Sequence, residues 1–97
     1  MSLVFYFPNA NSDRARMLKR TLWRRRARGE IGEFKVDYFA GELYLIVEEK
    51  DYERVLGLLP RSYLAGAKVR RKGEYGRWVE PLMFGTANGR KLSRATS

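Results

Sequence analysis

The side chains of this sequence best suited to binding chemistry are its arginines, which are concentrated near the N-terminus. Residues 16–29, RMLKRTLWRRRARG, hold seven basic side chains and no acidic one. A guanidinium group is planar and always charged, so it can donate two parallel hydrogen bonds to a phosphate and can stack on a base. These residue types therefore predict binding to a polyanion.

Four of these arginines recur every four residues: Arg16, Arg20, Arg24 and Arg28. On a helix they form one row, with neighbours about 6 Å apart along the axis. This separation resembles that of successive phosphates along a nucleic-acid strand. Trp23 lies beside the row, where it would either stack on a base or pack against the protein's own core.

A second basic group occupies residues 61–72, which hold five basic side chains and no acid. On a pair of strands such side chains can track a nucleic-acid backbone. The same composition also protects an exposed sheet edge from aggregation. The candidate nucleic-acid-binding residues of this group are Lys68, Arg70, Arg71, Lys72 and Arg77.

The sequence contains no histidine and no cysteine. That composition excludes disulfide bonds, thiolate nucleophiles, histidine acid–base catalysis and the usual Cys/His zinc sites. A metal-dependent nuclease would have to draw on Asp37, Glu42, Glu48, Glu49 and Asp51. We expect Asp37 and Glu48 to face solvent and the last two to begin a helix. We therefore expect no enzyme activity, no catalytic or metal-binding residue and no cofactor.

The formal net charge is +9, from 20 Lys and Arg against 11 Asp and Glu. Residues 14–28 hold eight basic groups and no acid, whereas residues 30–53 hold eight acids. A field of this size attracts polyanions, so RNA or DNA is the expected partner. The alternative explanation is an arginine-rich genome and an ordinary solvated helix face. Since the apolar runs are far shorter than the roughly 20 residues of a membrane span, we expect no membrane segment and a cytoplasmic location.

Apolar spacing predicts the elements that position these groups. The run LVFYF at residues 3–7 predicts a central strand, buried on both faces and ended by Pro8. Asn11 or Ser12 would cap a helix that runs to about Arg28, with Gly29 just beyond its end. The stripe of this helix that packs on the sheet is Ala15, Leu18 and Leu22.

From residue 34 the apolar period changes to two. A break at residues 40–41 predicts a hairpin between strands at 34–38 and 43–47. A second helix, capped near Asp51 and ended by Pro60, would bury Tyr52, Val55, Leu56 and Leu59. We expect a loop at 61–66, a strand at 67–71, a turn at 72–76 and a further strand or extended segment at 77–84, which Pro81 confines to an edge.

The order strand, helix, strand, strand, helix, strand predicts an α+β domain of the ferredoxin-like, split βαβ class. Two helices would cover one face of an antiparallel sheet. We expect this domain over residues 1–84, followed by a flexible basic tail over 85–97. The other face would carry aromatic side chains drawn from Phe5, Phe7, Phe34, Tyr38 and Tyr44. Such a face can stack single-stranded RNA, or it can be buried in a homodimer.

Two known families share this order of elements. LVFYFP on the first strand and GELYLIVE on the third resemble the RNA-recognition-motif family, whose third-strand signature is matched at Gly41 and Tyr44. That resemblance implies RNA stacking by Tyr44 and Phe5. The segments VFYFPNANSDRARMLKRTL and FAGELYLIVEEKDYERVLGLLP are similar to the NusG N-terminal domain family. The second resemblance implies a role in transcription elongation and binding to RNA polymerase.

The leading hypothesis from the sequence is a small basic nucleic-acid-binding protein. It would contact phosphates through the arginine-rich helix and the basic strand pair, in transcription or in a ribonucleoprotein. The alternative hypothesis is a protein–protein interaction module, either a homodimer or an RNA polymerase partner, that does not bind nucleic acid directly.

Overall fold

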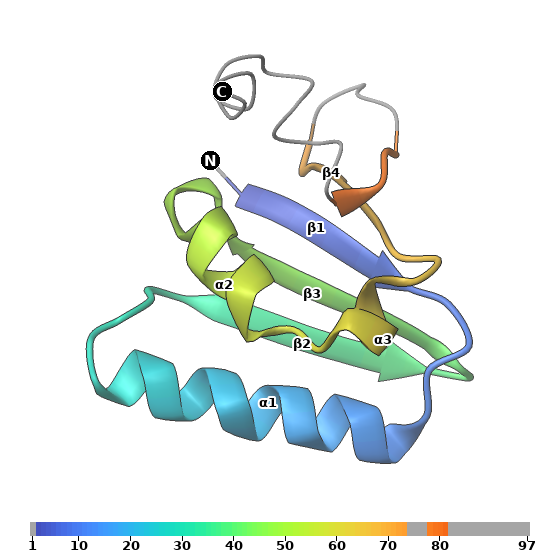
Figure 1. Ribbon diagram of the computed structural model, residues 1–97, viewed down its shortest axis with the longest axis horizontal. Helices are drawn as coiled ribbons and strands as arrows, with labels where there is room; N and C mark the ends of the chain where they lie inside the picture. The colour runs from blue at the N-terminus through green and yellow to red at the C-terminus, as the bar shows by residue number, and fades with distance from the viewer. Residues whose placement is uncertain (1, 74–77, 82–97) are drawn as a thin grey trace.

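Strand β1 (Ser2–Phe7) lies at the centre of a four-stranded antiparallel sheet, as its apolar sequence predicts. The computed structural model describes residues 2–73 and 78–81. The strands follow the order β2-β3-β1-β4 across the sheet, and each neighbouring pair is antiparallel (Figure 1). The elements in chain order are β1, α1 (Ser12–Ala27), β2 (Phe34–Phe39), β3 (Glu42–Glu48), the short 3-10 helix η1 (Glu49–Asp51), α2 (Tyr52–Leu58), α3 (Arg61–Leu64) and β4 (Lys68–Arg71).

One face of the sheet forms the core. Leu3, Phe5 and Phe7 of β1 stand opposite Val47, Leu45 and Leu43 of β3, and none of the six is more than 2% exposed. Because side chains alternate along a strand, these residues share one face. They form a single core with buried residues of α1 and α2: Leu18, Leu22, Tyr52 and Val55. The α+β class is therefore confirmed, with an antiparallel sheet and helices covering its core face.

Helix α1 begins and ends where the sequence predicts. The Asn11 side chain accepts a hydrogen bond from the Arg14 N–H at 2.7 Å, which satisfies one of the unpaired donors of the first turn. Beyond the other end, Gly29 has φ +79°, the left-handed conformation that terminates many helices. Leu18 and Leu22 are buried and Ala15 packs against them, so the predicted stripe is also confirmed.

The β2–β3 hairpin turns through Ala40 and Gly41, which have φ values of +51° and +87°. Positive φ at both central residues is the backbone of a type I′ turn, whose twist matches that of the flanking strands. The turn fixes the register in which Val36 faces Leu45 and Asp37 faces Tyr44. This hairpin therefore decides which β2 and β3 side chains face away from the helices.

Three expectations about local structure were wrong. Residues 61–64 form the short helix α3, not a loop. Tyr63 and Leu64 of this helix pack against the core. Asp51 makes no capping hydrogen bond; its buried carboxylate accepts from the Gly32 N–H at 2.8 Å and holds the α1–β2 loop. Strand β1 is fully buried only on its core face, because Tyr6 on the other face is half-buried.

Part of the C-terminal prediction falls outside the described residues, namely most of the 72–76 turn, residues 82–84 of the extended segment and the 85–97 tail. Within 78–81, Val79 pairs with Val69 of β4 in one antiparallel bridge, and Pro81 is buried. In the described segments, no helix combines the length and the apolar character needed to cross a bilayer.

Candidate nucleic-acid interface

The predicted arginine row lies on the exposed side of α1, opposite Leu18 and Leu22. Its two ends have acidic partners: Arg16 forms an ion pair with Asp13, and Arg28 approaches Glu30 at 3.9 Å. Arg20 and Arg24, in the middle, form no ion pair with any residue that the structure describes. The uncompensated charge of the row is therefore concentrated on Arg20 and Arg24.

A shallow groove of about 220 Å³ runs between α1 and β2, next to this row. Arg16 and Lys19 line its α1 side, and Val36 and Tyr38 line its β2 side. The groove offers an anion the ammonium group of Lys19 in addition to Arg16 of the row. The groove extends the candidate surface from the exposed side of α1 toward β2.

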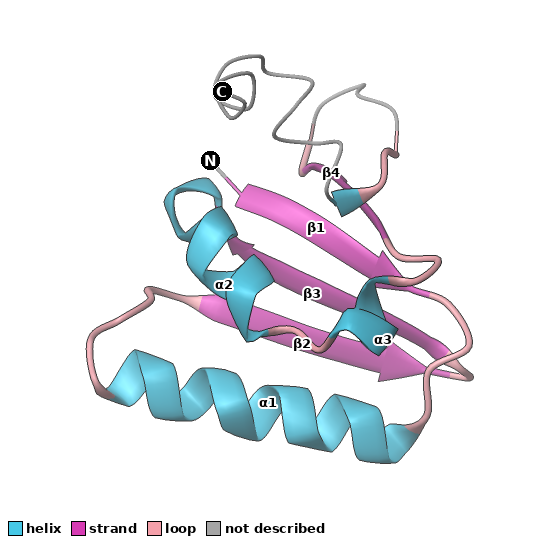
Figure 2. Ribbon diagram, viewed as in Figure 1, coloured by secondary structure: helices cyan, strands magenta, loops and turns pink. Residues whose placement is uncertain are grey.

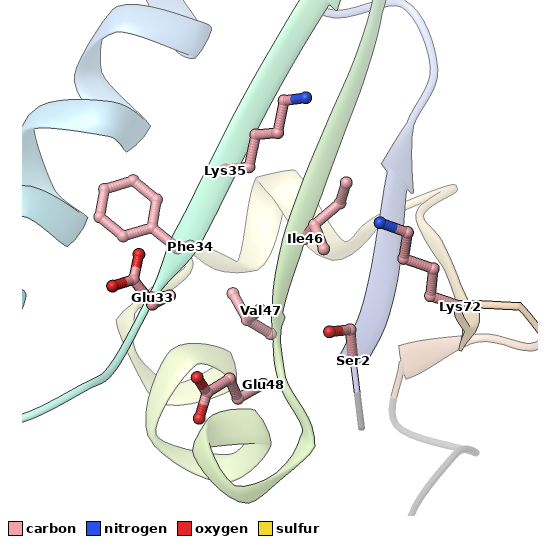
Figure 3. A pocket seen from close by; sticks show the side chains of 8 residues that line it. All are labelled: Ser2, Glu33, Phe34, Lys35, Ile46, Val47, Glu48 and Lys72. Atoms are coloured by element: carbon pink, nitrogen blue, oxygen red, sulfur yellow. The ribbon is translucent and has the colours of Figure 1, made fainter.

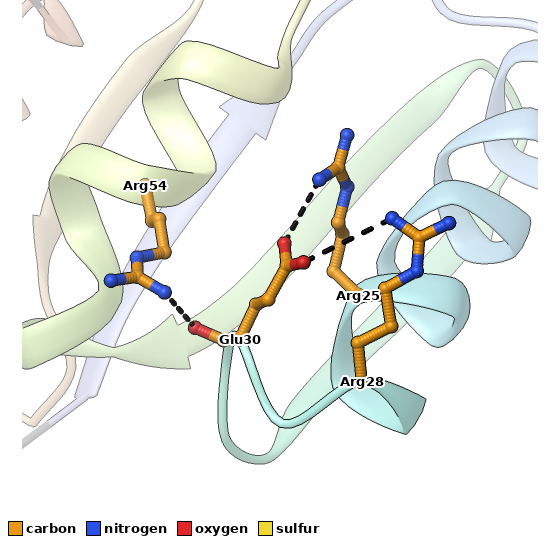
Figure 4. Close-up of polar contacts among 4 residues, drawn as sticks. All are labelled: Arg25, Arg28, Glu30 and Arg54. Atoms are coloured by element: carbon orange, nitrogen blue, oxygen red, sulfur yellow. Dashed lines mark hydrogen bonds and ion pairs between the residues drawn. The ribbon is translucent and has the colours of Figure 1, made fainter.

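The C-terminal end of α1 is tied down by a cluster of arginines around Glu30 (Figure 4). Arg25 donates to the Glu30 carboxylate at 2.9 Å, and Arg54 of α2 donates to the Glu30 backbone carbonyl at 2.9 Å. The hydrogen bond from Arg25 has the largest effect on the pKa of Glu30 and lowers it; burial acts in the opposite direction, and the charges of Arg25, Arg28 and Arg54 lower the pKa further. These arginines therefore join α1 to α2, and Arg28 is the member of the row that belongs to this cluster.

Trp23 packs against the protein. Its ring meets the ring of Phe34 on β2 edge to face, with centroids 5.7 Å apart, and the Arg26 guanidinium lies 5.0 Å from its centroid. Arg26 is in turn held by Glu33 at 2.9 Å. The side chain remains 51% exposed. Trp23 thus occupies the position expected of a residue that extends the core, with one part of its ring still open to solvent.

The second basic group divides between the two faces of the sheet. Arg71 stands opposite Leu3 on the core side and binds the Glu49 carboxylate through two hydrogen bonds of 3.2 and 2.9 Å. Lys68 and Arg70 alternate with it and face away from the helices. Lys72 follows the strand and is exposed, and Arg77 lies outside the described residues.

The structure does not bring the two basic groups together. Figure 2 shows α1 beside β2, at the opposite edge of the sheet from β4. The strand order places β3 and β1 between them. The residues predicted to bind nucleic acid therefore form two separate surfaces, one on α1 and one beside β4.

The sheet face away from the helices, which we call the open face, carries an aromatic cluster. Tyr6 of β1 and Tyr44 of β3 stack with centroids 5.1 Å apart, and Trp78 lies 5.9 Å from Tyr6. The Arg70 guanidinium lies 5.0 Å from the Trp78 ring centroid. The rings therefore join three segments of the chain into one surface.

The predicted composition of this face was largely wrong. Of the five aromatic residues named from the sequence, only Tyr44 faces outward; Phe5, Phe7, Phe34 and Tyr38 lie in register with core residues of β3. Sequence reasoning missed Tyr6 and Trp78. Side chains alternate between the two faces along β1, so the sequence could have placed Tyr6 on the open face only if another β1 residue had first been assigned to the core.

A hollow of about 400 Å³ lies at the end of the open face where β1 begins (Figure 3). Lys35 of β2 and Lys72, just after β4, stand on its two sides, with Ile46 of β3 between them (Figure 3). Glu33 and Glu48 close one end. The hollow therefore continues the open face with side chains of both charges.

Among the residues that the structure describes, no group of three or more Asp and Glu side chains is arranged to hold a metal ion. No protein-family model matches the chain, no curated protein is similar to it in sequence, and no solved structure matches it.

Proposed function

We propose that this protein binds nucleic acid, mainly through phosphates, with the exposed side of α1 as one contact surface. The observation that carries the proposal is the pair Arg20 and Arg24, which lie one turn apart without an acidic partner among the described residues. Like charges at this spacing repel by a few tenths of a kcal/mol. A bound phosphate would convert that repulsion into attraction.

The remaining charges support the same proposal. Arg16 and Lys19 flank the pair along the α1–β2 groove, and the whole chain carries a formal charge of +9. Arginine is the side chain best fitted to bind phosphate with two parallel hydrogen bonds. We place this activity in transcription or in a ribonucleoprotein, as the resemblances suggest.

The proposed fold is the ferredoxin-like, split βαβ arrangement. The strand order β2-β3-β1-β4 supports it, because α1 connects β1 to β2 across the strand β3 that lies between them. The second crossover, from β3 through α2 to β4, has the same form around β1. In this arrangement one sheet face is left without helices.

A salt series tests the proposal. Binding of fluorescein-labelled duplex and single-stranded oligonucleotides is measured by anisotropy at salt concentrations from about 50 to 300 mM. A duplex that contacts Arg16, Arg20 and Arg24 neutralises three phosphates, so the logarithm of affinity should fall against the logarithm of salt with a slope of roughly −3. Binding that does not change with salt, or the absence of binding at the lowest salt, would contradict the proposal.

A second candidate function is protein–protein interaction, as a homodimer or with RNA polymerase. Phe39, at the end of β2, favours it because 83% of this large apolar residue is exposed. The mass in solution, measured by light scattering for the wild type and for Phe39→Ser, tests the homodimer. A monomeric wild type would contradict it.

A further inference from the structure

We infer that the outer edge of β2 binds the same edge of a second copy of the chain, with the two strands antiparallel and centred on Val36. The two four-stranded sheets then form one continuous sheet. The inference rests on the homodimer named above as a second candidate, and it specifies the interface and the register of that homodimer. It leaves the nucleic-acid proposal for α1 in place, so the two can fail separately.

The first observation is that β2 has an unpaired edge (Figure 1). It is the first strand in the order β2-β3-β1-β4, and in the described part of the chain it pairs with β3 alone. Its outward backbone N–H and C=O groups therefore have no strand partner there. At the other edge of the sheet, β4 is already bridged to Val79. The unpaired groups of an edge strand are a template for an added strand.

Helix α1 meets β2 through the side chains of one face. Phe34 packs against α1, and Val36 and Tyr38 line the groove between the helix and the strand. Because side chains alternate along a strand, these three share the core face, and Lys35 and Asp37 lie exposed on the opposite face. The groove leaves room beside β2 for the side chains of an added strand.

The second observation is that the charges of β2 complement themselves in one antiparallel register. When Val36 faces its own copy across a two-fold axis, Lys35 stands opposite the partner's Asp37 and Asp37 stands opposite the partner's Lys35. Within one strand, the Lys35 ammonium already lies 3.8 Å from the Asp37 carboxylate. Each of the four charges then has opposite charges as its neighbours, both along and across the strands. Opposite charges directly across antiparallel strands stabilise the pairing.

The neighbouring registers lose this complementarity. Residues that oppose each other must lie on the same face of the sheet, so the two-fold axis has to pass beside one residue of the strand. An axis beside Lys35 or beside Asp37 places two like charges directly opposite each other, which destabilises the pairing. An axis nearer to either end of β2 pairs only a short segment. The axis beside Val36 is therefore the one that the charges favour.

The third observation is that the core-face side chains fit the same register. Val36 meets its own copy, and Phe34 of each chain meets Tyr38 of the other. In the single chain Phe34 and Val36 are half-buried, and Tyr38 is 38% exposed. Pairing covers this apolar surface, and aromatic pairs across antiparallel strands contribute to stability.

The geometry also links association to anion binding. Arg16 and Lys19 line the groove beside Val36 and Tyr38, so pairing brings the grooves of both copies to one two-fold axis. The cations of the two grooves repel each other, and a bound phosphate chain removes this repulsion. Because coupling between two binding events is reciprocal, a duplex that contacts both grooves should favour the dimer, and the dimer should bind that duplex more tightly.

Single cysteines test the register, because the sequence contains no cysteine of its own. Directly opposed residues of antiparallel strands have Cα atoms about 4.5–5.5 Å apart, which a disulfide can span. Under mild oxidation, Val36→Cys should therefore form a covalent dimer on non-reducing electrophoresis. Lys35→Cys alone and Asp37→Cys alone should not, because each lies roughly 8 Å from its own copy. An equal mixture of these two variants should form a cross-linked heterodimer.

Charge exchange tests the ion pairs. Asp37→Lys places like charges opposite each other and should weaken association, measured by sedimentation equilibrium, by roughly 5- to 100-fold. Adding Lys35→Asp to it returns opposite charges to both positions at the original net charge and should restore association to nearly that of the wild type. Glu53→Lys, at an exposed residue of α2, makes the same change in net charge and should leave association nearly unchanged. Circular dichroism melting establishes that each variant is folded.

The outcomes separate this inference from the other proposals. A wild type that remains monomeric would overturn both the inference and the homodimer, and the nucleic-acid proposal would stand. A dimer that Val36→Cys does not cross-link, or that Lys35→Cys cross-links to its own copy, would keep the homodimer and overturn this interface. Failure of Lys35→Asp to rescue Asp37→Lys would also overturn it. Cross-linking through Val36→Cys in a protein that binds no oligonucleotide would support the inference and contradict the nucleic-acid proposal.

Discussion

The double variant Arg20→Ala and Arg24→Ala should lose duplex binding without losing stability. The two side chains are exposed, lie on the side of α1 opposite its buried stripe and have no acidic partner among the described residues. Their removal breaks no ion pair with a described residue and opens no cavity. Alanine is also the best helix former, and the substitution removes like-charge repulsion. The melting temperature should therefore stay the same or rise slightly.

The size of the binding loss follows from the number of phosphates released. Each phosphate contact on a duplex contributes about 0.9 to the slope of the logarithm of affinity against the logarithm of salt concentration. Two lost contacts should therefore reduce the magnitude of this slope by about 1.8. Relative to about 1 M salt, where counterion release contributes nothing, the affinity at about 0.1 M should fall by a factor of about 60. The loss should be the same for duplexes of unrelated sequence, because phosphates carry no sequence information.

The assay is the anisotropy titration over a salt series, with a control of equal charge. Lys50→Ala with Arg61→Ala also reduces the formal charge from +9 by two. Both control residues are exposed and neither belongs to the arginine row of α1; Lys50 lies on η1 and Arg61 on α3. The control should lose only the few-fold affinity that follows from a weaker overall field.

Two results would refute the reasoning. Affinity within a factor of two of the wild type, with an unchanged salt slope, would show that phosphate does not contact Arg20 and Arg24. An equal loss in the two double variants would show that the ligand responds to net charge and not to the arrangement of charges on α1.

Three further predictions concern stability. Leu22→Ala should lower the free energy of unfolding in urea by about 2–5 kcal/mol because Leu22 is fully buried, whereas Met17→Ala, at a residue 59% exposed, should change it by less than about 0.5 kcal/mol; equal effects would contradict the assigned helix faces. Burial, and secondarily the nearby Glu53 charge, raises the pKa of Tyr52 from 10.0 to about 12. The fold therefore favours the neutral phenol, and this contribution is complete below pH 10 and is lost as pH rises through 12. Between these pH values the wild type should lose about 1–2 kcal/mol more stability than Tyr52→Phe, a figure that allows for partial solvent screening, and parallel pH profiles would refute the assignment. Because the pKa of Glu30 is lowered, its contribution is present above the ordinary value of 4.5 and is lost as pH falls through the lowered pKa. Glu30→Gln should melt at a lower temperature than the wild type near pH 7, with the difference disappearing in acid; a difference that persists in acid would point to a contact independent of the carboxylate charge.

The local elements were predictable because their signals are short-range. Asn11 and Gly29 bound α1 through their own side-chain and backbone preferences. The alternation around residues 40–41 predicted the β2–β3 hairpin, whose turn residues have the positive φ that a tight hairpin requires. In each case the residues that carry the signal are also the residues that form the structure.

The role of Asp51 was not predictable for the opposite reason. Its sequence position before a helix favours a cap, but its carboxylate binds the Gly32 N–H, 19 residues earlier in the chain. Arg71 likewise binds Glu49, 22 residues away. A side chain with several partners in reach takes the one that the packed fold brings closest, and sequence spacing does not state which that is.

The sequence by itself determined the helix faces, the positions of the strands and the segregation of basic and acidic residues along the chain. Only the tertiary structure decided which aromatic residues face the core, because an apolar run such as LVFYF does not show which of its alternating side chains point inward. The pairing of β1 with β3 and β4 buries Phe5 and leaves Tyr6 on the open face. Only the strand order decided that the basic residues of α1 and those of β4 lie at opposite edges of the sheet. Composition counts charges, but their separation in space depends on long-range strand pairing.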